Sequence, residues 1–499
     1  MNGDFVSWRD YQGLSTMGDQ VGALGGVASA DEVSALNKAL MAGQDINNPG
    51  TAPGVGFPLR LESLDSTLFN VTYQMKGAGG RGGIPFWASL YKDAATNTVE
   101  EFDQLVSYGS GNAVWMNEGA LPAEDTSTYA RNYTVIKYMG TVRRVSMVMG
   151  MLRSKFGDIM AREAVNGTMF LLRQLERTLF DGDENMMPVQ MDGLEKLSTV
   201  AWGNTALDDG YVSGYESDNV IDLRGNPLSE DHIADMVERL IAEPNYGRPS
   251  DLWLPPGPVK DLSKIMYPKE RYDLPAPKGG MAGISIQGVS TPFGNIKLQN
   301  DIFIPDSTTA NAAGVGQTAT RPNPPVLGAI TTPAYAGTNT TYWGAADAGT
   351  YIYQVVACSA LGKSAPVTSG GITVAALDQV SIPVTDGGNG TTYYEIYRSD
   401  LGGTAATCRF IMKVASAGAL TTLVDLNRFL PNCSKGYMLS GGSEVMKIKQ
   451  LAPFTKVPLA TIDTSVRWAQ ILLLALQIQK PLHNGIFINI GKLPTGAFA

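Results

Sequence analysis

Histidine and cysteine are scarce in this sequence, and their scarcity limits the chemistry that the chain can perform. The 499 residues include two histidines, His232 and His483, and three cysteines, Cys358, Cys408 and Cys433. A zinc site or a Ser-His-Asp arrangement requires a histidine with partners at suitable spacing, and neither histidine has them. Cys-x-x-Cys and His-Glu-x-x-His motifs are missing from the sequence. We therefore expect no catalytic residues, no metal site and no cofactor, and we interpret the cysteines as free thiols.

Charge and long apolar runs are also in short supply. Charged residues make up 17% of the chain, against about 25% in typical soluble proteins, and the net charge is −9. We do not expect such an acidic chain to grip nucleic acid along its surface, although it could enclose DNA. The longest uncharged apolar stretch, Ile471–Leu476, is far shorter than the roughly 20 residues of a membrane helix. Residues 1–10 also lack the basic start and apolar core of a secretory signal.

The first 65 residues are predicted to form an arm that lies across another chain. They are rich in glycine and other small residues, so we expect this segment to become ordered by contact with another chain and not to fold independently. Phe5, Trp8 and Tyr11 supply aromatic surface for such a contact. A glycine cluster, Gly77–Gly83, then precedes a strand-like aromatic run, Ile84–Trp87. We interpret the cluster as a flexible turn, because a phosphate-binding loop requires a helix directly after it.

Two helices are clearly encoded. Apolar residues recur at steps of three and four across Asp158–Phe180, and the first residue of this range is a good N-cap. The predicted helix is roughly 33 Å long and would be the spine of its domain. Ser229 caps the second helix, in which His232 is interpreted as a capping or solvated residue. A shorter helix is expected near Val259–Met266.

The composition changes after about residue 320, where charges thin out and threonine, glycine and tyrosine rise. Strand signals then repeat at short intervals between glycine-rich turns, which is typical of an all-β sandwich. The predicted strands are Gly349–Ser359, Gly371–Ala375, Val380–Val384, Thr391–Ser399, Arg409–Val414 and Leu420–Leu426. Longer hydrophobic strands return at Ile471–Ile478 and Ile486–Ile490, so the sandwich is predicted to be an insertion.

Two short motifs favour turns over ligand sites. Gly362–Ser364 resembles the end of a phosphate loop, but Ala357 replaces the first glycine of that motif. Asp181–Asn185 resembles the start of a calcium loop, but Met186 stands where glycine is required. We interpret the first motif as a turn between strands and the second as a helix end followed by an acidic surface loop.

Positive charge is concentrated between Arg131 and Arg177. This stretch has nine basic and three acidic residues, a local charge of +6, which leaves −15 for the rest of the chain. It could bind an anionic substrate or DNA, but it lacks the aromatic interleaving of a single-strand binder. We favour a basic strip that docks on an acidic surface of the next subunit. The candidate contacts are Arg131, Lys137, Arg143, Arg144, Arg153 and Lys155.

The segment Gly111–Pro122 carries a family resemblance. An aromatic residue is followed there by Glu-Gly-Ala and a proline, and basic strands (Tyr133–Val148) and the long helix come next. The signature residues are Trp115, Glu118, Gly119 and Pro122. This order of elements resembles the major capsid proteins of tailed bacteriophages, over roughly residues 1–315 and 435–499. The resemblance implies an α+β capsid fold of the Hong Kong 97-like type.

The segment from Pro325 to Cys433 resembles a second family, the immunoglobulin-like and fibronectin-type modules of phage structural proteins. The similar stretches are Tyr351–Ala357, Leu361–Pro366 and Tyr393–Arg398. The expected fold class is therefore α+β, with an inserted all-β immunoglobulin-like sandwich.

The capsid resemblance also implies how the chain is divided. The expected parts are an N-terminal arm (1–65), lead-in strands of the peripheral domain (66–107), an extended loop (108–152), the spine helix and peripheral domain (153–199), an axial domain (200–320), the insertion (321–433), and return strands of the axial and peripheral domains (434–499). The extended loop would lie across a neighbouring subunit, and the insertion would face outward. No Lys–Asn cross-link is predicted, because Lys137 is the one lysine of the expected extended loop.

The function that the resemblance implies is structural. The chain would assemble with itself, as hexamers and pentamers, into the icosahedral head of a phage, and would enclose double-stranded DNA without sequence-specific binding or membrane contact. A separate scaffolding protein and a portal are expected partners, a decoration protein is a further candidate, and assembly would occur in the host cytoplasm. The alternatives are a tail, baseplate or surface adhesin protein with an immunoglobulin-like module, and an enzyme that acts on anionic substrates.

Overall fold

The computed structural model describes residues 85–109, 115–121, 124–151, 158–199, 219–243, 245–270, 288–305, 307, 321–336, 341–460 and 463–493. The chain divides into two compact units, Met1–Phe69 and Asn70–Ala499, and every described residue belongs to the second. The expected arm aromatics Phe5, Trp8 and Tyr11 lie outside the described residues, as do Pro122, Arg153 and Lys155.

The predicted spine helix is confirmed as α5 (Ile159–Asp181). Its N-cap is Asp158, whose side chain accepts a hydrogen bond from the backbone N–H of Met160 at 2.8 Å. This bond satisfies one of the free N–H groups of the first turn. One face of the helix is apolar and fully enclosed, and its leucines are Leu171, Leu172, Leu175 and Leu179. The burial of that face fixes α5 in the body of the unit.

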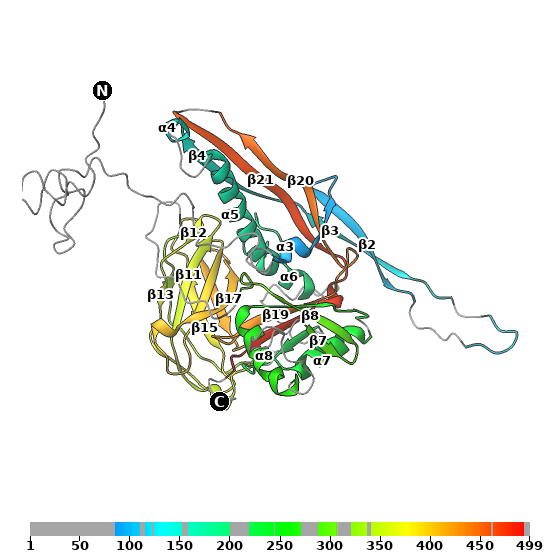
Figure 1. Cartoon of the computed structure of the whole chain (residues 1–499). Helices are drawn as coiled ribbons and strands as arrows, with labels where there is room; N and C mark the ends of the chain where they lie inside the picture. The colour runs from blue at the N-terminus through cyan, green and yellow to red at the C-terminus, as the bar shows by residue number, and fades with distance from the viewer. Residues whose placement is uncertain are drawn as a thin grey trace, which may run out of the picture. The chain divides into compact units, whose positions relative to one another are not determined.

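A four-stranded sheet packs against α5, in the order β1-β20-β21-β4. Its strands are β1 (Tyr91–Ala94), β4 (Lys137–Ser146), β20 (Met446–Pro458) and β21 (Ser465–Ile478). β1 pairs with β20 in parallel, and the other neighbours are antiparallel. The side-chain amide of Gln470 donates to the carbonyl oxygen of Ala164 in α5 at 2.7 Å. Segments far apart in the sequence therefore share one sheet (Figure 1).

A six-stranded mixed sheet has the order β5-β22-β19-β6-β8-β7. Its strands are β5 (Val220–Asp222), β6 (Asp251–Leu254), β7 (Gly288–Thr291), β8 (Gly294–Asn300), β19 (Ser434–Leu439) and β22 (Gly485–Ile490). The helices α7 (Glu230–Ile241) and α8 (Pro256–Glu270) share its hydrophobic cluster, and α6 (Leu194–Thr199) follows α5. The N-cap of α7 is confirmed: Ser229 Oγ accepts from the N–H of His232, and His232 Nδ1 accepts from the N–H of Ser229.

The aromatic run after the glycine cluster is a short helix, α3 (Pro85–Ser89), and not the strand that the sequence suggested. The carboxyl group of Glu176 in α5 accepts hydrogen bonds from the N–H groups of Phe86 and Trp87, at 2.8 and 2.9 Å. The two oxygens of a carboxyl group can satisfy the free donors of a first helical turn, and proline suits the first helical position. The local sequence pattern favoured a strand because it gives no sign of Glu176, which lies 90 residues away and stabilises the helix.

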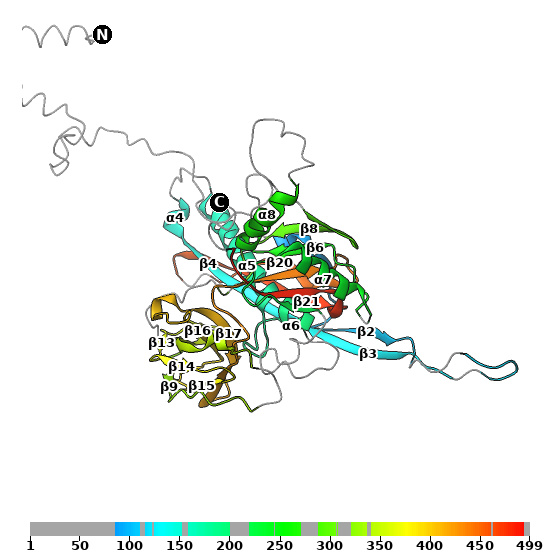
Figure 2. The ribbon, with the colours of Figure 1, turned by 90° about the horizontal axis from the view of Figure 1, so that it is seen from below.

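The region 326–425 is an all-β domain, whose strands confirm the six predicted from the sequence. They are β9 (Val326–Leu327), β10 (Gly349–Tyr351), β11 (Tyr353–Ser359), β12 (Gly362–Lys363), β13 (Val367–Thr368), β14 (Ile372–Val374), β15 (Val380–Thr385), β16 (Tyr393–Arg398), β17 (Arg409–Ala415) and β18 (Leu420–Asp425). One sheet has the order β12-β11-β16-β17 with β13 beside β11, another is β18-β15-β9, and β10 pairs with β14 (Figure 2). The two larger sheets contribute to one core cluster. The chain leaves the six-stranded sheet after β8 and returns to it in β19, so this domain is an insertion.

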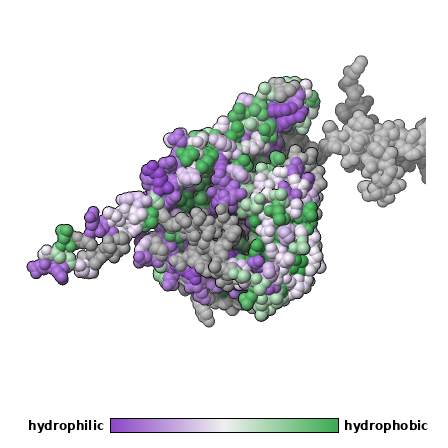
Figure 3. Space-filling view, turned by 180° about the vertical axis from the view of Figure 1, so that it is seen from behind, coloured by the Kyte–Doolittle hydropathy of each residue, from purple (hydrophilic) through white to green (hydrophobic). Residues whose placement is uncertain are grey.

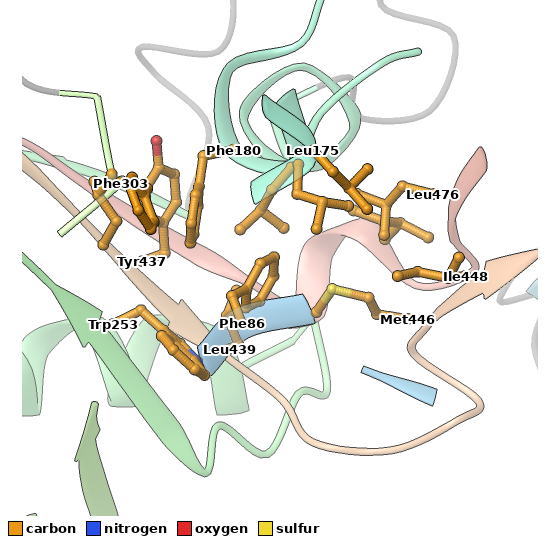
Figure 4. Close-up of a cluster of buried hydrophobic side chains, with 14 of the residues drawn as sticks. Phe86, Leu175, Phe180, Trp253, Phe303, Tyr437, Leu439, Met446, Ile448 and Leu476 are labelled. Carbon is orange, nitrogen blue, oxygen red and sulfur yellow. The ribbon is translucent and has the colours of Figure 1, made fainter. Parts of the chain in front are cut away.

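The four-stranded and six-stranded sheets, with the helices packed on them, form what we call the body. Aromatic side chains join these two sheets through α3 and α5. Phe86 stacks on Phe180 with ring centroids 4.6 Å apart, and Phe180 stacks on Tyr437 at 5.2 Å. Trp253 meets Phe86 edge-on at 5.1 Å. Leucine, isoleucine and methionine side chains complete this cluster (Figure 4). Offset and edge-on ring pairs stabilise beyond simple area burial, so this cluster helps to hold the two sheets together.

Candidate assembly surface

A two-stranded hairpin extends from the body in both ribbon views (Figures 1 and 2). Its strands are β2 (Val99–Ser107) and β3 (Thr128–Val135), paired antiparallel from Val99↔Val135 to Ser107↔Thr128. The expected extended loop, 108–152, therefore differs from the structure at both ends. The hairpin begins at β2, and β4 does not belong to it because β4 pairs with β21 along its whole length in the four-stranded sheet. The helix α4 (Met147–Met151) follows β4.

The hairpin exposes large apolar side chains. Trp115 is 92% exposed and Leu121 93%, and Tyr108, Tyr129 and Tyr133 are similarly open to solvent. A two-stranded ribbon buries little of its own surface and is marginally stable alone. Exposed apolar surface of this kind marks an interaction site. Tyr129 and Tyr133 of β3 were not predicted as contact residues, although aromatic residues four positions apart lie on one face of a strand and could have signalled them. Hydrophobic and hydrophilic residues lie side by side along the hairpin (Figure 3).

The family signature forms a tight turn within this hairpin. The N–H of Ala120 donates to the carbonyl oxygen of Asn117 at 3.0 Å, and Gly119 has φ +84°. A positive φ at the third position of such a turn favours glycine. Trp115 and Glu118 are exposed beside the turn, and Pro122 lies outside the described residues. The signature thus shapes an exposed tip, which leaves its tryptophan available to another chain.

The hairpin is acidic, which corrects the expectation that it carries the basic strip. Residues 99–135 include six acidic residues and one basic residue, Arg131, for a net charge of −5. Arg131 pairs with Asp103 at 2.8 Å and with Glu101 at 3.5 Å, and all three side chains are largely exposed. The hydrogen bond from Arg131 lowers the pKa of Asp103 and the same bond raises the pKa of Arg131. Both groups are therefore charged at neutral pH.

The remaining described members of the basic strip lie on β4, in the body. Lys137 pairs with Glu184 at 2.6 Å, Arg143 with Glu163 at 2.8 Å and Arg144 with Asp463 at 3.0 Å. Each therefore has an acidic partner in its own chain, and a role in binding a neighbour stays a prediction. The side chain of Arg144 is 60% exposed and is the most accessible of the three. By sequence, residues 137–162 carry six basic residues and one acidic residue, a net charge of +5.

Potential metal ligands are dispersed and the thiols are buried in the described part of the chain. In that part of the chain no three His, Cys, Asp or Glu side chains gather as a metal site would require. The three cysteines are free, as predicted, and the structure buries all of them; burial raises the pKa of Cys358 to about 12. Such a thiol stays protonated at neutral pH and is a poor nucleophile. Within the same ranges we find no helix that is both long and apolar enough to span a membrane.

Comparison with known protein families identifies the family of the chain that carries this surface. The model of the SU10 major capsid protein family matches residues 43–318, more than half of the chain. The chain belongs to the SU10 major capsid protein family. The predicted resemblance to major capsid proteins of tailed phages is thereby confirmed, and this capsid protein is a component of the virion.

Individual relatives resemble this capsid protein along most of its length. The major capsid protein of Staphylococcus phage S25-3 is 23% identical over 441 residues, which cover 85% of this chain and 88% of that protein. The putative major capsid protein of Enterococcus phage phiEF24C is 23% identical over 451 residues, covering 88% and 91% of the two chains. Among solved structures, the capsid of a native GTA particle aligns with 87% of this chain and 96% of that chain, at 10% identity and a TM-score of 0.43.

Proposed function

We propose that this capsid protein assembles with itself, as hexamers and pentamers, into an icosahedral head that encloses the double-stranded DNA of a tailed phage. The order of elements supports a Hong Kong 97-like fold: an extended hairpin, a spine helix, a six-stranded domain and late strands that return to both sheets. In this proposal the protein is not an enzyme, and it is assembled in the host cytoplasm with a separate scaffolding protein and a portal. A decoration protein is a further candidate partner.

The hairpin is the observation that carries the proposal. Its apolar side chains are largely exposed, and its net charge of −5 is opposite in sign to the +5 that residues 137–162 carry by sequence, of which Lys137, Arg143 and Arg144 also have acidic partners in their own chain. Opposite charges on two surfaces speed encounter and fix register, whereas buried apolar side chains supply affinity. We therefore place the hairpin of one copy on the β4–α5 region of its neighbour. Contact with a second copy would also stabilise a ribbon that is marginal alone.

The all-β domain is proposed to be an immunoglobulin-like module on the outer surface of the shell. Two observations support the immunoglobulin-like assignment. Its two larger sheets share one core, with Trp343 and Tyr353 among the fully buried side chains. Strands from distant parts of the domain are also paired, as β9 is with β15. The outward position is an expectation from the family resemblance.

A test of the hairpin mechanism replaces its most exposed apolar side chains. The double variant Trp115→Ser/Leu121→Ser should fold as the wild type does, because both side chains are open to solvent. Losing the burial of two large apolar side chains should raise the concentration needed for assembly by about tenfold or more. Assembly is followed by size-exclusion chromatography and negative-stain microscopy, and folding by circular dichroism.

The matched control is Leu361→Ser, which removes an apolar side chain 67% exposed in the all-β domain. It should assemble at the wild-type concentration. Shells from the hairpin variant at that same concentration would contradict the hairpin mechanism. A wild-type chain that stays monomeric with its co-expressed virion proteins would contradict the assembly function itself.

A further inference from the structure

The all-β domain contacts the C-terminal end of α5 through a partly buried lysine. Lys413 of β17 donates to the carboxylate of Asp181, the last residue of α5, and approaches the carbonyl oxygen of the same residue at 3.4 Å. The two side chains are 22% and 26% exposed. A cation at a helix C-terminus also interacts favourably with the free carbonyl groups there. The all-β domain therefore supplies a positive charge at the C-terminal end of α5, a helix of the body.

Lys413 is the middle of a series of alternating charges that runs from the all-β domain into the body. On the domain side it is paired across the sheet with Glu395, whose carboxylate also accepts from Lys363 at 2.6 Å. Burial lowers the pKa of Lys413, but Asp181, Glu395 and Glu195 raise it above its ordinary value. Lys363, Glu395 and Lys413 thus form a group of alternating charge, in which Glu395 is buried, Lys413 partly buried and Lys363 about half exposed.

On the body side the series ends in a buried ion pair between α6 and β19. Lys435 lies 2.6 Å from Glu195, and the two side chains are 11% and 7% exposed. Burial raises the pKa of Glu195, Lys435 lowers it, and the negative charge of Asp181 raises it further. Lys413 offsets that negative charge. Without Lys413, Asp181 would lose its ion pair, and its negative charge would act on the buried Glu195 without the offset that Lys413 provides, which is costly.

Apolar and backbone contacts fix the same two parts together. Met186 and Met187, in the loop after α5, pack on a cluster of the all-β domain that includes Tyr393 and Tyr397. The segment by which the chain leaves the domain is held as well: the side chain of Asn489 in β22 donates to the carbonyl oxygen of Arg428 at 2.7 Å and accepts from the N–H of Leu430 at 2.9 Å.

Arg224, which follows β5, binds both the entry side and the exit side of the domain. Its guanidinium donates to the carbonyl oxygens of Asn427 at 2.7 Å and of Tyr342 at 3.2 Å. A module joined only by flexible linkers would show none of these contacts. The ion pairs, the methionine contact and the held exit segment together tie the domain to both α5 and the six-stranded sheet.

We propose that the all-β domain is a structural support for the C-terminal end of α5, and that the body needs its Lys413 to keep the segment 176–199 folded. The domain is then an integral part of the shell protein as well as a surface module. This inference is independent of the assembly proposal, because it concerns the unassembled chain and is tested there.

Hydrogen exchange measured by mass spectrometry on the full-length, unassembled chain tests this support. Lys413→Met should speed amide exchange in the segment 176–199 by roughly tenfold, because the partly buried Asp181 loses its ion pair, its charge beside Glu195 is no longer offset, and the segment opens more often. The double variant Lys413→Met/Asp181→Leu should return exchange toward the wild-type rate, since it removes both members of the pair. Lys363→Met is the matched control: this lysine is 54% exposed and contacts only the domain side of the series, so exchange in 176–199 should not change.

Two results would overturn the inference. One is wild-type exchange in the segment 176–199 of Lys413→Met. The other is equal acceleration by Lys413→Met and by the double variant, which would mean that the lysine acts on α5 by some route other than Asp181. Both results are readable without assembly, so they leave the shell function untouched.

Discussion

The carboxyl group of Glu176 offers a quantitative test of how the body is held together. Glu176 is fully buried and accepts two hydrogen bonds from α3. Burial and then the neighbouring Asp301 raise its pKa to about 9, and the two N–H donors oppose the shift without reversing it. Burial also raises the pKa of Asp301, which is 1% exposed. At neutral pH this pair holds a proton that the unfolded chain does not.

The sign of the resulting pH dependence follows from proton binding. A carboxyl group whose folded pKa is raised from 4.5 to about 9 stabilises the fold below pH 4.5, and this stability is lost progressively as pH rises to 9. The loss is about 1.4 kcal/mol per pH unit in this interval. Between pH 6 and pH 8, Glu176 should therefore lower the free energy of unfolding by roughly 3 kcal/mol.

The variant Glu176→Gln removes the titration and keeps the shape. Glutamine has one acceptor oxygen for two N–H donors, so the variant should be less stable than the wild type at pH 6. The difference in stability should narrow or reverse by pH 8, because only the wild type loses stability as pH rises. Urea unfolding followed by tryptophan fluorescence at the two pH values measures this difference.

The control is Glu163→Gln, a partly exposed glutamate of the same helix. It should follow the pH profile of the wild type. Parallel profiles for the wild type and Glu176→Gln would refute the reasoning, since they would mean that Glu176 is ionised in the folded chain and that Asp301 alone carries the proton.

Two smaller predictions concern helices. Gly167→Ala in α5 should destabilise the fold by about 1–3 kcal/mol, because the added methyl group would collide with the buried Gln470. Gly150→Ala in α4, with open space around it, should be neutral or stabilising. Thermal unfolding that ranked the two variants in the opposite order would show that Gln470 moves aside. Ser229→Ala should lower stability by about 1 kcal/mol through loss of the α7 cap, as measured by chemical denaturation, whereas an unchanged midpoint would mean that water replaces the cap.

Elements with local causes were predictable from the sequence. The start of α5 at Asp158, the cap of α7 at Ser229 and the strands of the all-β domain depend on residues close together in the chain, and all were found within a few residues of their predicted positions. Periodicity and capping report such elements directly. The order of elements also pointed to the capsid family, and the family match confirms that interpretation.

Features with distant causes were not predictable. The strand-like run at Phe86 is helical because Glu176 satisfies its first turn. The basic residues of β4 were assigned to the extended loop because nothing near them in the sequence reveals their pairing with β21. The acidic charge of the hairpin was countable from the sequence, but only after the structure had placed its ends at Val99 and Val135. A single sequence gives no access to such long-range partners.

The strand order of the six-stranded sheet has a consequence for synthesis on the ribosome. β22 (Gly485–Ile490), close to the C-terminus, pairs with β5 in parallel and with β19. The body therefore cannot complete its sheet until the ribosome has passed residue 490. The all-β domain, whose strand pairs are all contained in residues 326–425, can close earlier. Since domains generally fold as units during synthesis, the all-β domain should already be folded when the last strands of the body emerge, and the body can then pack against it.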